Sequence, residues 1–222
     1  MSSEQNATSN RILSIYKSRL TIINYMEAVG YNTNGYNIFS INEIDAMYHN
    51  TQLDMLLTHT VDPKKVYIKY HFSSKISFKQ MRPQTLDTII DDLYDIDNVL
   101  TKSDTLVIIV DEEPNASMIT KIKYVYDATG IFVVMHNIKR LQFNLLEHTL
   151  VPKVEILTNE QVEALKKTLN MKTLSQLPEI SRFDPQALAI MLRPGQVAKF
   201  TRTSQTALTS IYYRVCVWKM SV

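Results

Sequence analysis

The segment from Leu177 to Val217 reads LPEISRFDPQALAIMLRPGQVAKFTRTSQTALTSIYYRVCV and sets the fold of the last third of the chain. Asp184 followed by Pro185 is typical of a helix start, because the carboxylate accepts from the first N–H groups and proline needs no N–H there. A short helix is therefore predicted over Ala187–Leu192. Pro194 and Gly195 then end this helix with a turn.

Two alternating segments follow the turn, Val197–Arg202 and Leu208–Trp218, and they predict an antiparallel hairpin. One face of the second strand is expected to be apolar and to carry Ile211, Tyr213, Val215 and Val217. The single cysteine, Cys216, lies on this strand and is predicted to be a small buried hydrophobic residue. The segment is thus predicted to be a small α+β module.

Composition excludes several classes of protein. The chain has 222 residues, of which 45% are hydrophobic and 21% charged, as in an ordinary globular protein. One cysteine excludes an intrachain disulfide and a thiolate zinc cluster, and the five histidines show no metal-binding spacing. The chain starts without the basic and apolar regions of a signal peptide and has no apolar run of membrane-spanning length. We therefore expect an intracellular protein with no membrane partner, no bound metal and no cofactor.

Hydrophobic periodicity in the first two thirds predicts a mixed sheet with flanking helices. Met1–Asn10 is polar, without periodicity, and is expected to be frayed. Helices are expected over Arg11–Val29, from a capping box at Ser40 and Glu43 to Tyr48, over Thr85–Leu100, and from Ile119 to Gly130. Strands are expected at Leu53–Thr60, Val66–Phe72, Leu106–Val110 and Ile131–Met135.

The last two of these strands are continuously apolar and enclose a helix, which predicts a right-handed crossover between buried parallel strands. We expect this α/β domain over residues 1–143. The α+β module, with a further helix opened by a capping box at Thr158 and Gln161, is expected over residues 144–222.

Charge is segregated along the chain although the formal net charge is only +2. Residues 64–82 contain six basic side chains and no acidic one: Lys64, Lys65, Lys69, Lys75, Lys79 and Arg82. Residues 87–113 contain nine acidic side chains against Lys102 alone. Such polarity can direct a polyanion to one side of a domain, while the alternative is two solvated faces of a stable domain.

The C-terminal stretch resembles a known family in its ordered series Leu-Pro-x-Ile, Asp-Pro, Gly-Gln-Val and Thr-Ala. From about Phe143 to Val217, the chain is similar to the C-terminal domain of the fifth subunit shared by the eukaryotic nuclear RNA polymerases, and to the corresponding small subunit of the archaeal RNA polymerase. The chain departs from the family pattern at Val154, where the family usually has histidine, and at Gln205, where it has glutamate. Met191 and Leu208 stand where the family often has glycine.

The resemblance implies a non-catalytic subunit of a multisubunit DNA-directed RNA polymerase. Its C-terminal module would dock onto the largest subunit and neighbouring small subunits, and its N-terminal, nuclease-like domain would form a jaw beside downstream DNA. The docking candidates are the matching motif residues His148, Pro152, Asp184, Pro185, Gly195, Lys199, Arg202, Ser204, Thr206, Tyr213 and Arg214.

The resemblance also points to the loop after the buried strand at 106–110, which would face DNA phosphates. Pro114, Asn115 and Ala116 begin the following helix, whose free N–H groups can bind a phosphate. Ser117 replaces the family's lysine, and Lys121, one turn later, can compensate. In the C-terminal module, the departures at Val154, Met191, Gln205 and Leu208 lead us to expect altered partner contacts with the fold preserved.

Two alternatives stay open from the sequence. Asp111 and Glu113 at the end of a buried strand, with Lys69 nearby, are the candidate residues of a magnesium-dependent nuclease. A free transcription adaptor outside the polymerase is the other alternative. Heavy use of Asn, Ile, Lys and Tyr suits an AT-rich genome such as that of a large DNA virus, so we expect the nucleus if the protein is cellular, and the virion and host cytoplasm if it is viral.

Overall fold

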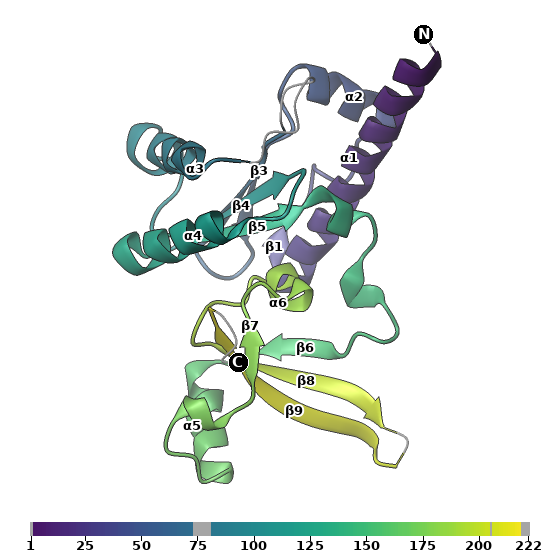
Figure 1. The fold of residues 1–222 in the computed structure, drawn as a ribbon. Helices are drawn as coiled ribbons and strands as arrows, with labels where there is room; N and C mark the ends of the chain where they lie inside the picture. The colour runs from purple at the N-terminus through teal and green to yellow at the C-terminus, as the bar shows by residue number, and fades with distance from the viewer. Residues whose placement is uncertain (1, 73–80, 205, 219–222) are drawn as a thin grey trace. The chain divides into compact units, whose positions relative to one another are not determined.

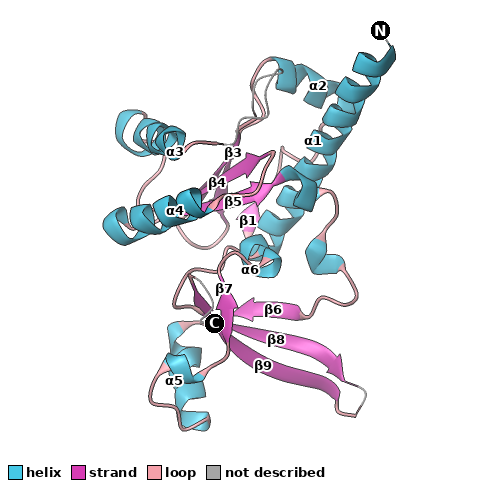
Figure 2. Ribbon diagram, viewed as in Figure 1, coloured by secondary structure: helices cyan, strands magenta, loops and turns pink. Residues whose placement is uncertain are grey.

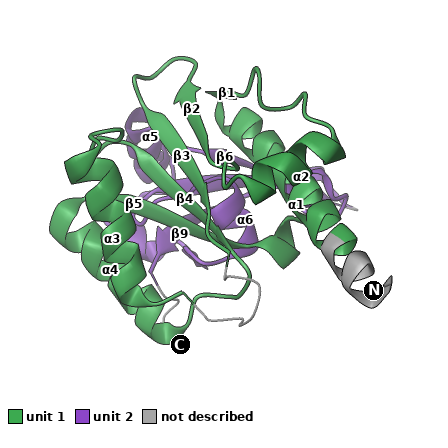
Figure 3. Cartoon of the chain, turned by 90° about the horizontal axis from the view of Figure 1, so that it is seen from above, with its two compact units in different colours: residues 1–143 green, residues 144–222 purple. Residues whose placement is uncertain are grey.

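The computed structural model describes residues 2–72, 81–204 and 206–218. The chain divides into two compact units, residues 1–143 and residues 144–222 (Figure 3). Each unit has its own β-sheet and its own helices (Figure 2). Among the described residues, none of the helices has the length and apolar character needed to cross a membrane.

Unit 1 is built on a five-stranded sheet in the order β1-β2-β3-β4-β5. The strands are β1 Tyr31–Asn32, β2 Met55–His59, β3 Lys65–Tyr70, β4 Thr105–Val110 and β5 Phe132–Asn137. The first three pair antiparallel, and β3, β4 and β5 pair parallel, which confirms the predicted mixed sheet. Every residue of β4 and β5 is buried, as predicted for strands covered on both faces.

The helices of unit 1 cover both faces of this sheet (Figures 1 and 3). They are α1 Ser2–Val29, α2 Ile41–His49, α3 Pro83–Ile90 and α4 Ala116–Thr129. The predicted capping box at Ser40 and Glu43 opens α2, and Gly130, in the left-handed conformation, ends α4. The helix α4 joins β4 to β5 and confirms the predicted crossover.

Two helix boundaries in unit 1 were predicted wrongly. The helix α1 begins at Ser2 and not at Arg11, because polar residues without periodicity can extend a helix that has already formed, each adding one backbone hydrogen bond. The helix predicted over Thr85–Leu100 ends earlier. Its second part, Asp91–Ile96, is a π-helix, in which the N–H of Asp97 donates to the carbonyl of Asp92 at 2.8 Å.

Unit 2 is built on a four-stranded sheet in the order β6-β8-β9-β7. The strands are β6 Lys153–Ile156, β7 Glu179–Ser181, β8 Val197–Ser204 and β9 Leu208–Val217. The antiparallel β8–β9 pairing confirms the predicted hairpin (Figure 1). The helix α5, Asn159–Thr168, opens at the predicted capping box and packs Leu165 and Val162 against the base of this hairpin.

The helix α6, Pro185–Ala189, confirms the predicted start, since the Asp184 carboxylate accepts from the N–H of Gln186 at 2.9 Å. It is shorter than the predicted span to Leu192, and the chain turns at Met191 with a φ of 53°. Leu208, at the start of β9, has a φ of 59°. Both residues therefore adopt the left-handed conformation that favours glycine, which accounts for the glycine that the resembled family often has at these positions.

Candidate subunit-docking surface and DNA-facing loop

The loop predicted to face DNA joins β4 to α4. The Asn115 side chain caps α4 by accepting from the N–H of Met118 at 2.9 Å and from the Ser117 hydroxyl at 2.8 Å. Asn115, Ala116 and Ser117 are exposed, and Pro114 is half-buried. The N–H groups of Ala116 and Ser117 have no partner within the helix, so this end of α4 can accept an anion.

The acidic side chains of the same loop are engaged by arginines from other elements. Asp111 pairs with Arg11 of α1, and Glu113 pairs with Arg140 at 2.7 Å. The lysine that the nuclease alternative requires, Lys69, pairs instead with Asp54 at 3.3 Å. Within residues 2–72, 81–204 and 206–218, no group of three or more metal-ligating side chains is placed to hold an ion. The groups named for the nuclease alternative therefore serve as separate ion pairs.

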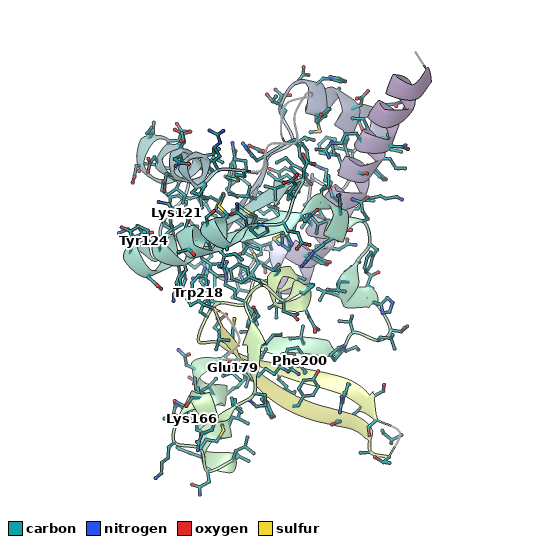
Figure 4. All side chains as sticks on the ribbon, in the orientation of Figure 1. Lys121, Tyr124, Lys166, Glu179, Phe200 and Trp218 are labelled. Atoms are coloured by element: carbon teal, nitrogen blue, oxygen red, sulfur yellow. The ribbon has the colours of Figure 1, made fainter. Side chains whose placement is uncertain are left out.

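Lys121, the lysine expected to compensate for Ser117, is half-buried on α4. Its ammonium lies 2.8 Å from the Asp87 carboxylate of α3 and 5.4 Å from the centre of the Tyr124 ring (Figure 4). A phosphate would have to compete with Asp87 for this lysine. The neighbouring Lys123 is exposed on the same helix.

The basic segment 64–82 is partly neutralised by local partners. Lys64 pairs with Asp62 at 2.7 Å, and this hydrogen bond lowers the pKa of the Asp62 carboxyl. Lys65 and Arg82 are exposed, whereas Lys75 and Lys79 lie outside the described residues. In the acidic segment, Asp104 is buried and accepts from three donors, including the N–H of Lys65 at 2.6 Å, so it holds β3 to the turn before β4 and does not add to the surface charge.

Most of the predicted docking residues in unit 2 build its fold. The carbonyl of Pro152 accepts from the Gln186 amide at 2.7 Å, and the Gly195 N–H donates to the carbonyl of Cys216 at 2.8 Å with a φ of 85° at Gly195. The Ser204 hydroxyl accepts from the N–H of Ala207 at 3.3 Å and lies 3.4 Å from the Thr206 hydroxyl. Tyr213 packs against the core of the unit. Together with Asp184 and Pro185 at the start of α6, these residues maintain the fold of unit 2.

The remaining docking candidates present charge at the surface. Arg202 of β8 and Arg214 of β9 bring their guanidinium groups to 5.5 and 5.7 Å from the centre of one ring, that of Tyr212. Tyr212 in turn stacks on Phe200 at 5.0 Å with an interplanar angle of 8°. Phe200 is buried in the sheet of unit 2 (Figure 4). The sheet thus supports two cations beside one aromatic ring.

Lys199 and His148 already have partners within unit 2 and are therefore less available for contact with another subunit. The Lys199 ammonium lies 3.3 Å from the Glu155 carboxylate on the neighbouring strand β6. His148 is exposed after the short 3₁₀ helix Leu145–Glu147, and its Nδ1 accepts from the N–H of Leu150 at 3.2 Å. Of the residues selected by the motif, Arg202 and Arg214 are therefore the strongest candidates for contact with a partner.

Sequence reasoning missed the apolar side chains that unit 2 exposes. Leu150, Leu208 and Ile211 are 85%, 86% and 52% exposed. Ile211 lies on the predicted apolar face with Tyr213 and Val215, but the core cluster that contains Val215 and contacts Tyr213 does not include Ile211. Nothing in the alternating pattern of β9 distinguishes its covered end from its open end.

Comparison with known proteins matches this unit closely. Residues 143–216 match the family model described as RNA polymerase Rpb5, C-terminal domain. The DNA-directed RNA polymerase subunit Rpo5 of Archaeoglobus fulgidus is 44% identical over 77 residues, which are 35% of this chain and 100% of that protein. The chain belongs to the Rpb5/Rpo5 family of RNA polymerase subunits.

Two further Rpo5 proteins show the same coverage. The protein of Thermococcus kodakarensis is 41% identical over 76 residues, and that of Pyrococcus abyssi is 40% identical over 76 residues; each match covers 92% of the relative and 34% of this chain. The Rpo5 matches are therefore about as long as unit 2. This chain joins an Rpo5-like module to a longer N-terminal part.

Proposed function

We propose that this chain is a non-catalytic subunit of a multisubunit DNA-directed RNA polymerase. In this proposal, residues 144–222 form an assembly domain that docks onto the largest subunit and its small neighbours, and residues 1–143 form a jaw domain beside downstream DNA. The observation that carries the proposal is the 44% identity over the full length of an archaeal polymerase subunit. The polymerase acts in the nucleus if the chain is cellular, and in the virion and host cytoplasm if it is viral.

The geometry of unit 2 supports docking. Residues that match the family's pattern maintain the sheet and its turns, and Arg202 and Arg214 are held by Tyr212 at defined positions. Arginine is favoured at protein interfaces because its planar group stacks on rings and binds carboxylates with two hydrogen bonds. We therefore assign the main contact with the polymerase to this part of the sheet.

The contact of unit 1 with DNA is assigned to phosphates alone. The N-terminus of α4, with Lys123 and Arg82 exposed, offers positive charge, but no side chain of the loop is suited to reading bases. Glu112 is exposed beside it and limits the attraction. We expect an auxiliary grip on the duplex that involves a few phosphates.

Purification of the polymerase through a tag on this chain tests the docking. The largest polymerase subunits are expected in near-equal amounts with the tagged chain, and Arg202→Glu combined with Arg214→Glu should reduce that yield. Recovery of the tagged chain without polymerase subunits would contradict the proposal. It would favour the free adaptor.

The same preparation tests the DNA contact. Log affinity for duplex DNA falls as log salt concentration rises, and Lys123→Ala in the assembled polymerase should make this slope shallower by about one. An unchanged slope would show that this helix does not contact DNA.

A magnesium-dependent cleavage assay, with Asp111→Ala as the control, tests the nuclease alternative, and we expect no cleavage that depends on Asp111.

A further inference from the structure

The strand β9 is longer than β7, the strand that pairs with its outer edge. The strand β7 pairs parallel with β9 only at Val215–Val217, whereas β8 pairs with β9 from Leu208 to Val215. Within residues 2–72, 81–204 and 206–218, the part of β9 from Leu208 to Arg214 therefore pairs with a strand on one side only (Figure 1). We call this part the β9 edge.

The backbone direction at the β9 edge follows from the neighbouring bonds. The N–H of Val215 donates to the carbonyl of Pro178 at 2.9 Å, so the backbone groups of Val215 face the β7 side. Because these groups alternate along an antiparallel strand, those of Tyr213 and Ile211 face the same way. In the β7–β9 register, residue 178 would donate to the carbonyl of Tyr213, but Pro178 has no N–H. Pro178 thus ends the pairing and leaves the edge open.

The side chains beside this edge differ between the two faces of the sheet. On one face, Arg214 of β9 and Arg202 of the neighbouring strand β8 flank Tyr212. The Arg214 guanidinium also donates to the carbonyl of Glu179 in β7 at 3.4 Å, and neither arginine is paired with a carboxylate within the described part of the chain. On the other face lie Tyr213 and Ile211, the latter 52% exposed. An added strand would therefore meet cations on one face and apolar side chains on the other.

Open edges of this kind are usually blocked in natural proteins, because unpaired backbone groups recruit other strands. The β9 edge carries no lysine, proline or inward charge between Leu208 and Tyr213. Its hairpin is also held rigidly at the base, where Val197 and Val215 are buried in the core of the unit. A partner that adds a strand would satisfy the backbone and cover Ile211 together.

We propose that the β9 edge binds an extended segment of another polymerase subunit, which adds to the sheet as a strand. This segment alternates acidic residues, which face Arg202 and Arg214, with apolar residues, which face Ile211 and Tyr213. The proposal rests on the proposed function and specifies how that docking occurs. A second copy of this chain is a poorer occupant, since the arginines of both copies would share one face of the joined sheet and repel each other.

Hydrogen–deuterium exchange on the unaltered full chain, free and in purified polymerase, tests the proposal directly. The amides of Ile211 and Tyr213 should exchange about tenfold more slowly in the polymerase, as expected for new backbone hydrogen bonds. The amide of Thr203, which faces the opposite edge of the hairpin, serves as the internal reference. Incorporation of the chain without slower exchange at Ile211 and Tyr213 would overturn strand addition and leave the proposed function intact. Failure of the chain to enter the polymerase would overturn both.

A pair of proline variants gives an independent test. Ile211→Pro removes an outward N–H from the β9 edge, and Thr203→Pro removes an outward N–H from β8 beyond the end of β6. When each competes with the unaltered chain for incorporation, Ile211→Pro should be incorporated about three- to tenfold less well and Thr203→Pro equally well. Equal incorporation of both variants would contradict the proposal. The fluorescence of Trp218 checks that each variant is folded.

The charge pattern is tested by reversal. Arg202→Glu should weaken incorporation about two- to fivefold, and the effect should fall at high salt, whereas Lys167→Glu, the same reversal on the exposed part of α5, should have no effect. Equal effects would contradict an acidic partner. Slower exchange at the β9 edge in the chain alone at high concentration would identify a second copy as the occupant, and slower exchange on adding duplex DNA would identify nucleic acid; either result would overturn the proposal.

Discussion

Leu208→Gly and Met191→Gly should change the stability of unit 2 in opposite directions. Both residues have left-handed backbones, with φ values of 59° and 53°, but Leu208 is 86% exposed and Met191 only 7%. A residue other than glycine in this conformation lowers the free energy of unfolding by roughly 1–2 kcal/mol, and substitution by glycine relieves this strain. Glycine also gives the unfolded chain more conformational entropy, which offsets about 0.5–1 kcal/mol of the gain. The backbone contribution is therefore the same at both positions, and burial decides the sign.

The leucine side chain contributes little because so little of it is buried, less than about 0.5 kcal/mol. Leu208→Gly should therefore raise the free energy of unfolding by about 0.5 kcal/mol. Met191→Gly loses a buried side chain, which costs about 2–5 kcal/mol, so it should lower the free energy of unfolding by about 2 kcal/mol. The two variants should differ by about 2–3 kcal/mol.

Urea unfolding followed by the fluorescence of Trp218 measures both variants. Trp218 is the only tryptophan of the chain and lies directly after β9, with the guanidinium of Arg182 at 4.9 Å from its ring, so it reports on unit 2. Thr209→Gly, in the extended part of β9, is the control and should lower stability by up to about 1 kcal/mol. Equal shifts in one direction for the two left-handed positions would refute the reasoning.

Three further predictions concern buried groups. Burial lowers the pKa of His136 to about 4, below its ordinary 6.5. As the pH falls, the unfolded chain therefore binds the proton before the folded chain does, and the free energy of unfolding should fall by about 3 kcal/mol between pH 6.5 and 4. His136→Phe should remove this pH dependence when unfolding is followed by circular dichroism, and a variant with the same pH dependence as the unaltered chain would contradict the prediction. Gly30→Ala should lower the free energy of unfolding by about 2–4 kcal/mol, because φ is 99° and the new methyl group would lie 2.9 Å from Nε2 of His59. Gly130→Ala has open space around the new methyl group and should cost only about 1–2 kcal/mol of backbone strain. Equal losses for the two variants in thermal unfolding would show that the His59 contact does not matter. Burial raises the pKa of the Cys216 thiol to about 11, so it should react with a thiol reagent at pH 8 only after urea unfolds the chain, and fast labelling of the folded chain would show that the strand is not buried.

The parts of the fold that depend on local patterns could be predicted from the sequence. The apolar run at Leu106–Val110 is a buried strand, and the residues Ser40, Thr158 and Asp184 cap helices as expected. Each of these features depends on residues within a few positions of one another. Local chemistry is therefore sufficient to place them.

The features that bear on function depend on residues distant in sequence. Arg11 meets Asp111 across a hundred positions, and Lys121 meets Asp87 of a different helix, so their partners follow only from the assembled sheet. Pro178 leaves the β9 edge open only because of the register between β7 and β9. The motif identified the family, but it did not separate residues that shape the module from the arginines that it presents.

Chemical cross-linking of the purified polymerase tests the central claim most directly. Lys199 of β8 is paired with Tyr213 of β9, and Lys153 lies on β6, the next strand beyond β8. Neighbouring strands are about 5 Å apart, so an amine-reactive cross-linker attached to either lysine can reach a segment bound at the β9 edge. We predict that cross-links from these lysines lead to the largest polymerase subunit. Cross-links to other subunits that arise only from residues 1–143, with Lys153 and Lys199 open to solvent in the assembled enzyme, would contradict the account.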